Sequence, residues 1–198
     1  IFKVMTKFMP FLMLLFLGFF IACEPEDPYP ENDEESITDI TLNFVDDSGN
    51  TLTTVASDPD GDGPEDVQFE ESFTLKTSTQ YTLSIDLFNS MNNEDITQEV
   101  QEEAAEHQMF FAWSDGLFSD PSGTGNIADA TGTVNYSDSD SNGNPLGIVT
   151  EWTTGTEVGT ERDFQIILKH QPDIKTADTG AQDGETDIDL TFTISLED

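Results

Sequence analysis

A two-residue alternation of apolar and polar side chains is the feature that most restricts how this chain can fold. The longest example spans residues 188–196, where Ile, Leu, Phe, Ile and Leu occupy every second position and polar residues lie between them. Shorter examples occupy residues 40–44, 81–87 and 164–168. Because successive side chains of a strand point to opposite faces, this period indicates strands that bury one face.

Weaker strand patterns and turn clusters fill most of the remaining chain. The weaker strands are expected at residues 51–56, 67–75, 108–113, 131–136 and 147–154, and turns rich in Asp, Asn, Gly and Ser at 46–50, 58–64, 115–126, 137–145 and 177–184. Short strands with one polar face, joined by such turns, predict an all-β fold. We therefore expect residues 36–198 to form a single antiparallel β-sandwich domain, immunoglobulin-like or jelly-roll-like.

Residues 93–107 break the two-residue period and predict one short amphipathic helix. Ile96, Val100 and Ala104 are four residues apart, and Asn93 can serve as the N-cap. The face exposed to solvent would then carry four acids, which are Glu99, Glu102, Glu103 and Glu106.

The first 22 residues have the pattern of a secretory signal peptide. Lys3 and Lys7 precede an almost wholly apolar run at 8–22, which is too short for a comfortable membrane span and ends at Cys23, the single cysteine. Residues 20–23, Phe-Ile-Ala-Cys, resemble a bacterial lipobox. We therefore expect cleavage before Cys23 and a diacylglyceryl lipid on its sulfur, which anchors the protein in outer-membrane lipid.

The charge of the chain excludes two classes of partner. It has 41 acidic and 6 basic residues, for a formal net charge of -35. A nucleic-acid binder needs stripes of Lys and Arg, and a protein adsorbed on anionic lipid needs a basic patch. The expected partners are cations or basic surfaces, with no nucleic acid among them. Within the acidic, proline-rich residues 23–35, charge repulsion predicts an extended tether between lipid and domain.

Two loops have the first half of a calcium-binding loop, D-x-[DN]-x-[DN]-G. The alternate oxygen donors are Asp58, Asp60 and Asp62 in residues 58–63, and Asp138, Asp140 and Asn142 in residues 138–143. Neither loop has a glutamate at the twelfth position, so another carboxylate would have to complete each Ca2+ site. Those available are Asp66 or Glu65 for the first loop and Glu151 for the second. The alternative is that these residues only form turns between strands.

The two histidines are the candidate ligands for a transition metal. Glu103 lies one helical turn before His107 and Glu106 is adjacent to it, a spacing at which a carboxylate and an imidazole can share an ion. His170 continues the register of the apolar positions in residues 164–168. If the sheet brings the two histidines together, they and a helix carboxylate form a Zn2+ or Cu2+ site; otherwise each is an isolated imidazole.

The sequence has no signal for catalysis and a weak one for sugar binding. It contains no G-x-S-x-G, no H-E-x-x-H and no phosphate-binding glycine loop. With so many acids, a pair of carboxylates is uninformative. We therefore expect a protein that is not an enzyme. Five aromatic residues could stack on a glycan or else belong to the core: Phe110, Phe111, Trp113, Phe118 and Trp152.

Four segments resemble a group of small, uncharacterised outer-membrane lipoproteins of Bacteroidota-type bacteria. They are CEPEDPYP at 23–30, EEAAEHQMFF at 102–111, SDSNGNPLG at 139–147 and GETDIDLTF at 184–192. The resemblance implies a lipid-anchored protein at the outer membrane, facing the cell exterior rather than the periplasm, and association with a TonB-dependent receptor. The loose label of periplasmic binding fold given to such proteins implies alternating helices and parallel strands, whereas the pattern here predicts a sandwich.

Together these features predict a non-catalytic, surface-exposed outer-membrane lipoprotein that binds a ligand or metal as an accessory to a TonB-dependent transporter. The alternatives are a structural or adhesive module whose loops are made rigid by calcium, and a glycan-binding module.

Overall fold

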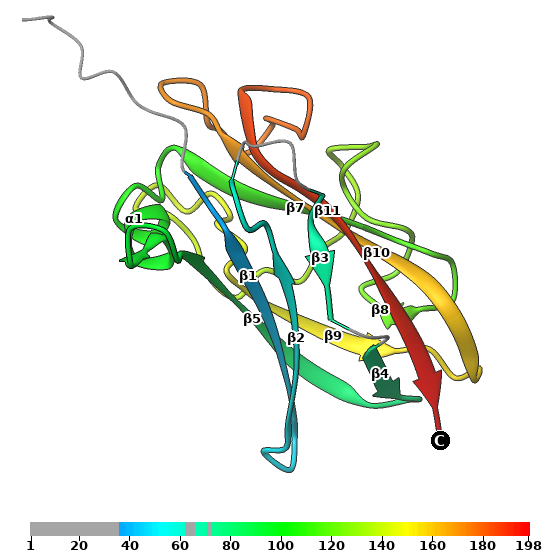
Figure 1. Cartoon of the computed structure of the whole chain (residues 1–198). Coiled ribbons are helices and arrows are strands. Elements are labelled where there is room, and N and C mark those ends of the chain that lie inside the picture. The colour runs from blue at the N-terminus through cyan, green and yellow to red at the C-terminus, as the bar shows by residue number, and fades with distance from the viewer. Residues whose placement is uncertain (1–35, 62–65, 71–72) are drawn as a thin grey trace, which may run out of the picture. The chain divides into compact units, whose positions relative to one another are not determined.

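The computed structural model describes residues 36–61, 66–70 and 73–198 (Figure 1). The expected signal peptide, Cys23 and the acidic tether lie outside the described residues, as do Asp62 and Glu65 of the first loop. Among the described residues, no helix is long and apolar enough to cross a membrane.

The strands pair into two sheets, as the two-residue period predicts (Figure 1). The first has the order β3-β2-β1-β5-β9-β8, with β6 paired to β5; its strands are β1 (Asp39–Asp46), β2 (Thr51–Ser57), β3 (Gln68–Phe69), β5 (Gln80–Asn89), β6 (Glu94–Asp95), β8 (Phe118–Asp120) and β9 (Val149–Thr154). The second has the order β4-β11-β10-β7; its strands are β4 (Phe73–Lys76), β7 (His107–Trp113), β10 (Gly159–His170) and β11 (Glu185–Glu197). The paired strands are antiparallel, apart from the parallel pair β4 and β11. The predicted all-β sandwich is confirmed.

The core lies between the sheets and is built from the alternating apolar positions. Phe164 of β10 is fully buried, and its ring centroid lies 5.3 to 6.3 Å from those of Phe44, Phe111, Phe118 and Trp152. Burying one such ring stabilises the fold by about 1.5–3 kcal/mol. The five aromatic residues considered for glycan stacking are each at most 5% exposed, so they are buried and offer no open face to a sugar.

Three segments differ from the sequence prediction. Residues 67–75 contain two short strands, β3 and β4, and residues 118–120, expected in a turn, form β8. Residues 131–136 form no strand; they make only an isolated antiparallel bridge, between Tyr136 and Thr150, and side-chain hydrogen bonds add to it. The Tyr136 hydroxyl donates to the Met109 carbonyl (2.7 Å) and accepts from the Asn126 side-chain amide (2.7 Å).

The helix α1 (Ile96–Glu102) is shorter than the predicted 93–107. Asp95, not Asn93, is the N-cap: its carboxylate accepts from the backbone N–H of Gln98 (3.3 Å), whereas Asn93 has a φ of 60° and lies in the preceding turn. The buried residues of the helix are Ile96 and Val100, as predicted. The helix ends at its C-cap, Glu103, so the chain turns into β7 within a few residues.

Candidate metal centre

The pairing of β7 with β10 places the two histidines side by side. His107 is the first residue of β7 and His170 the last of β10, and the antiparallel register sets them directly opposite each other. Their rings stack at a centroid distance of 4.6 Å with 10° between the planes, and the two side chains are 0% and 2% exposed. The sheet therefore brings the histidines together, as the metal interpretation of the sequence requires.

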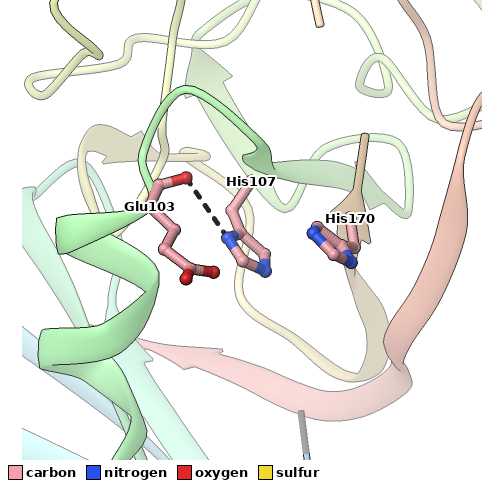
Figure 2. A group of neighbouring side chains, drawn as sticks. All are labelled: Glu103, His107 and His170. Carbon is pink, nitrogen blue, oxygen red and sulfur yellow. Dashed lines mark hydrogen bonds between the residues drawn. The ribbon is translucent and has the colours of Figure 1, made fainter. Parts of the chain in front are cut away.

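Glu103 completes a group of three residues that could hold a metal ion. One ligand atom from each of Glu103, His107 and His170 lies within 4.8 Å of the other two. Figure 2 shows Glu103 at the end of α1, His107 at the start of β7 and His170 on the neighbouring strand. Two imidazoles and a carboxylate are donors that suit Zn2+, Cu2+ and other first-row transition metals.

The backbone fixes which nitrogen of His107 can bind a metal. Nδ1 lies 3.3 Å from the carbonyl oxygen of Glu103 (Figure 2). Because a carbonyl only accepts, Nδ1 carries the proton and Nε2 keeps its lone pair. Nε2 is buried and has no hydrogen-bond partner among the described residues. Metal-binding histidines commonly donate their other N–H to a backbone carbonyl in this way.

Glu106 lies beside the group rather than in it. Its carboxylate is 3.5 Å from Nε2 of His170 and is partly exposed. Carboxylates in this position orient the imidazole of a metal site.

Because the stacked rings of His107 and His170 are nearly parallel, their ring-plane lone pairs do not converge. Binding of one ion to both therefore requires one ring to rotate.

Burial and local charge set the protonation of the group. Burial lowers the pKa of His107 to about 4, and the nearby charges of His170 and Lys175 act in the same direction. The imidazole is therefore neutral at pH 7, which is the form that binds metals. Burial also raises the pKa of Glu103, and the neighbouring Glu106 and Glu99 raise it further.

The second candidate calcium loop contains a cation supplied by the chain itself. The ammonium of Lys175 is 3.6 Å from Oδ2 of Asp140, and both side chains are fully buried. The same ammonium donates to the carbonyls of Ala104 (2.6 Å) and His107 (2.7 Å). Lys175 therefore joins the loop to the end of α1 and the start of β7, an ion pair that no sequence pattern indicated.

The carboxylates of that loop also accept turn hydrogen bonds. Asp138 accepts from the backbone N–H of Gly147 (2.7 Å), and Asp140 from those of Asn142 (2.8 Å) and Asn144 (2.9 Å). Burial acts to raise the pKa of Asp140, but the hydrogen bonds from Asn144 and Asn142 and the charge of Lys175 hold it below its usual value. These contacts are those expected of a turn, and calcium binding there stays a prediction.

The first candidate calcium loop is described only in part. The backbone N–H of Asp60 lies 3.4 Å from the carboxylate of Asp58, Asp66 is exposed, and Asp62 is outside the described residues. The group formed by Glu103 and the two histidines includes none of the described aspartates of this loop. Calcium binding here also stays a prediction, separate from the histidine site.

Fold and site together define a β-sandwich domain with a candidate metal centre of two histidines and one glutamate. No protein-family model, curated protein or solved structure matches the chain. What the chain does is therefore inferred from the geometry of the site and the pattern of the sequence.

Replacing Lys175 with Met tests whether its ammonium holds the end of α1. Met has a similar length but leaves buried Asp140 without its cation and two carbonyls without a donor. We expect Lys175→Met to lower the free energy of unfolding by about 3–5 kcal/mol in chemical denaturation. Lys76→Met, at an exposed position, should change it by less than about 0.5 kcal/mol. Equal stability of the two variants would contradict the role given to Lys175.

The lowered pKa of His107 predicts a pH dependence of stability. Between pH 6.5 and about 4, the unfolded chain protonates this imidazole and the folded chain does not. The stability associated with neutral, buried His107 is therefore fully present above pH 6.5. It is lost as the pH falls to about 4, which lowers the free energy of unfolding by an amount on the order of 2–3 kcal/mol. In urea denaturation series over this range, His107→Gln should lose stability less steeply than the unmodified protein. Equal slopes would show that His107 is not buried in neutral form.

Proposed function

We propose that this domain is a non-catalytic module that binds a divalent transition-metal ion, Zn2+ or Cu2+, through Glu103, His107 and His170. The observation that carries the proposal is the state of Nε2 of His107. It is buried, it keeps a lone pair because Nδ1 donates to the Glu103 carbonyl, and it lies in a group with two further metal-binding side chains. Because this imidazole is neutral at pH 7, no proton has to leave before the metal binds.

The charges around the site favour a cation over a neutral ligand. The raised pKa of Glu103 reflects burial together with the negative charges of Glu106 and Glu99. A divalent ion relieves that repulsion, and a neutral ligand does not. The net charge of -35 adds a long-range attraction for cations.

We further propose that a lipid on Cys23 holds the module on the outer face of the outer membrane, where it presents its metal to a TonB-dependent receptor. The apolar run at 8–22, the lipobox-like residues 20–23 and the acidic residues that follow support this placement. Because the negative charge of the chain opposes adsorption on anionic lipid, a covalent lipid is the attachment that its composition favours.

Thermal melting of the purified protein in detergent tests metal binding. After treatment with EDTA, Zn2+ or Cu2+ should raise the melting temperature, because an ion that binds only the folded state stabilises it by about 2.7 kcal/mol at 100 times its Kd. His107→Gln and His170→Gln should each abolish the shift. Glu99→Gln, on the exposed face of α1, should retain it.

The same melting experiment distinguishes the competing functions. A melting temperature that does not respond to Zn2+ or Cu2+ overturns the proposal. A shift with Ca2+ alone would instead support a calcium-stabilised structural module, for which Asp58, Asp60 and Asp62 are candidate ligands.

Cys23→Ser tests the anchor separately from the metal site. Without the thiol no lipid can be attached, so the variant should lose the acyl mass at its N-terminus and move from the outer-membrane fraction to the soluble fraction. Mass spectrometry and cell fractionation measure the two effects. A variant that stays in the membrane with an unchanged N-terminal mass would contradict lipidation at this residue.

A further inference from the structure

An irregularity in β11 turns one carboxylate toward the histidine pair. In the register of β10 with β11, Leu168 pairs with Ile188 but Lys169 pairs with Thr186, so Asp187 is an extra, bulged residue. In a regular strand, Asp187 and Ile188 would point to opposite faces. Bulges re-aim side chains, often next to functional sites. Here the Asp187 side chain is fully buried and faces His107.

The distance between the Asp187 carboxylate and the His107 imidazole suits two ligands of one ion. Oδ2 of Asp187 lies 3.9 Å from Nε2 of His107, too far for a hydrogen bond. Two atoms that each bind one metal at about 2 Å lie about 3–4 Å apart. The nitrogen that faces Asp187 is the one left with a lone pair by the hydrogen bond to Glu103.

A cavity and a close backbone contact complete the surroundings of Asp187. A cavity of about 190 Å³ is lined by Asp187 and Asp58 together with apolar side chains that include Ile37 and Val67. Gly184, just before β11, has a φ of 75°, and a Cβ there would clash with the carbonyl of His170. This glycine allows the start of β11 to approach the histidine pair.

We propose that Asp187 is the fourth ligand of the metal, with Glu103, His107 and His170. This inference rests on the proposed function and makes it more specific. Structural zinc sites use four protein ligands, whereas catalytic sites keep one position for water or substrate. With Asp187 bound, the ion has two imidazoles and two carboxylates and no open position. The site then holds a first-row divalent ion without acting on a substrate.

Asp187→Asn measures the contribution of this carboxylate to affinity. Zn2+ binding to the purified protein, followed by competition with a chromophoric chelator, should weaken about tenfold or more. Asp189→Asn is the matched control, because Asp189 is an exposed aspartate of the same strand that accepts from Gln165. Its Kd should stay unchanged.

Asp187→Cys shows whether residue 187 touches the metal. A thiolate bound to Co2+ gives an intense near-ultraviolet charge-transfer band, which an indirect structural role would not produce. We expect the band with Co2+ in Asp187→Cys and its absence in both Asp189→Cys and the unmodified protein, which contains Cys23.

The outcomes separate the two proposals. If the unmodified protein binds Zn2+ but Asp187→Asn binds it as tightly, or Asp187→Cys binds Co2+ without the band, Asp187 is not a ligand and the three-residue site stands. If the unmodified protein binds neither ion, the metal-binding function itself is wrong.

Discussion

The burial of two imidazoles between β7 and β10 is the constraint on which the rest of the site depends. His107 and His170 occupy the inward register of strands whose other inward positions are apolar, such as Met109 and Leu168. A polar ring in such a place destabilises the fold unless its nitrogens find partners. Burial lowers the pKa of His107 to about 4, so at neutral pH the ring is uncharged, with its one proton on Nδ1. In the proposed site, a metal ion would bind Nε2 and stabilise the neutral imidazole. The burial that destabilises the unliganded ring would then favour metal binding.

Positive charge is scarce in this chain, so the position of Lys175 has wide effects. The end of α1 is rich in glutamate, which is unfavourable beside the negative end of a helix dipole. The Lys175 ammonium offsets this by bonding the carbonyl of Ala104, and it also neutralises buried Asp140. At the aspartate-rich loop, the chain therefore provides its own cation. Glu103 and the two histidines form the group that could hold an external ion.

Periodicity predicted much of the fold and part of the site, because both follow from which face of a strand a residue occupies. The alternation at 164–168, extended by two residues, placed His170 on the inner face, and helical spacing placed Glu103 near His107. Asp187 and Lys175 could not be found in this way. The bulge that turns Asp187 inward exists only in the pairing of β10 with β11, and Lys175 reaches Asp140 through a loop. The late start of α1 likewise depends on Asp95, rather than Asn93, being the N-cap.

The positions of the proposed ligands determine what metal binding would do to the domain. Glu103 and His107 flank the turn between α1 and β7, His170 ends β10, and Asp187 lies near the start of β11. An ion that joins these segments adds its binding free energy to that of folding, since the unfolded chain holds no such site. Conversely, any motion that separates β10 from β11 weakens several ligands at once. Such coupling would suit the proposed module, which holds an ion and passes it to a partner. A catalytic centre keeps an open position for water or substrate, and Asp187, as the proposed fourth ligand, would occupy that position.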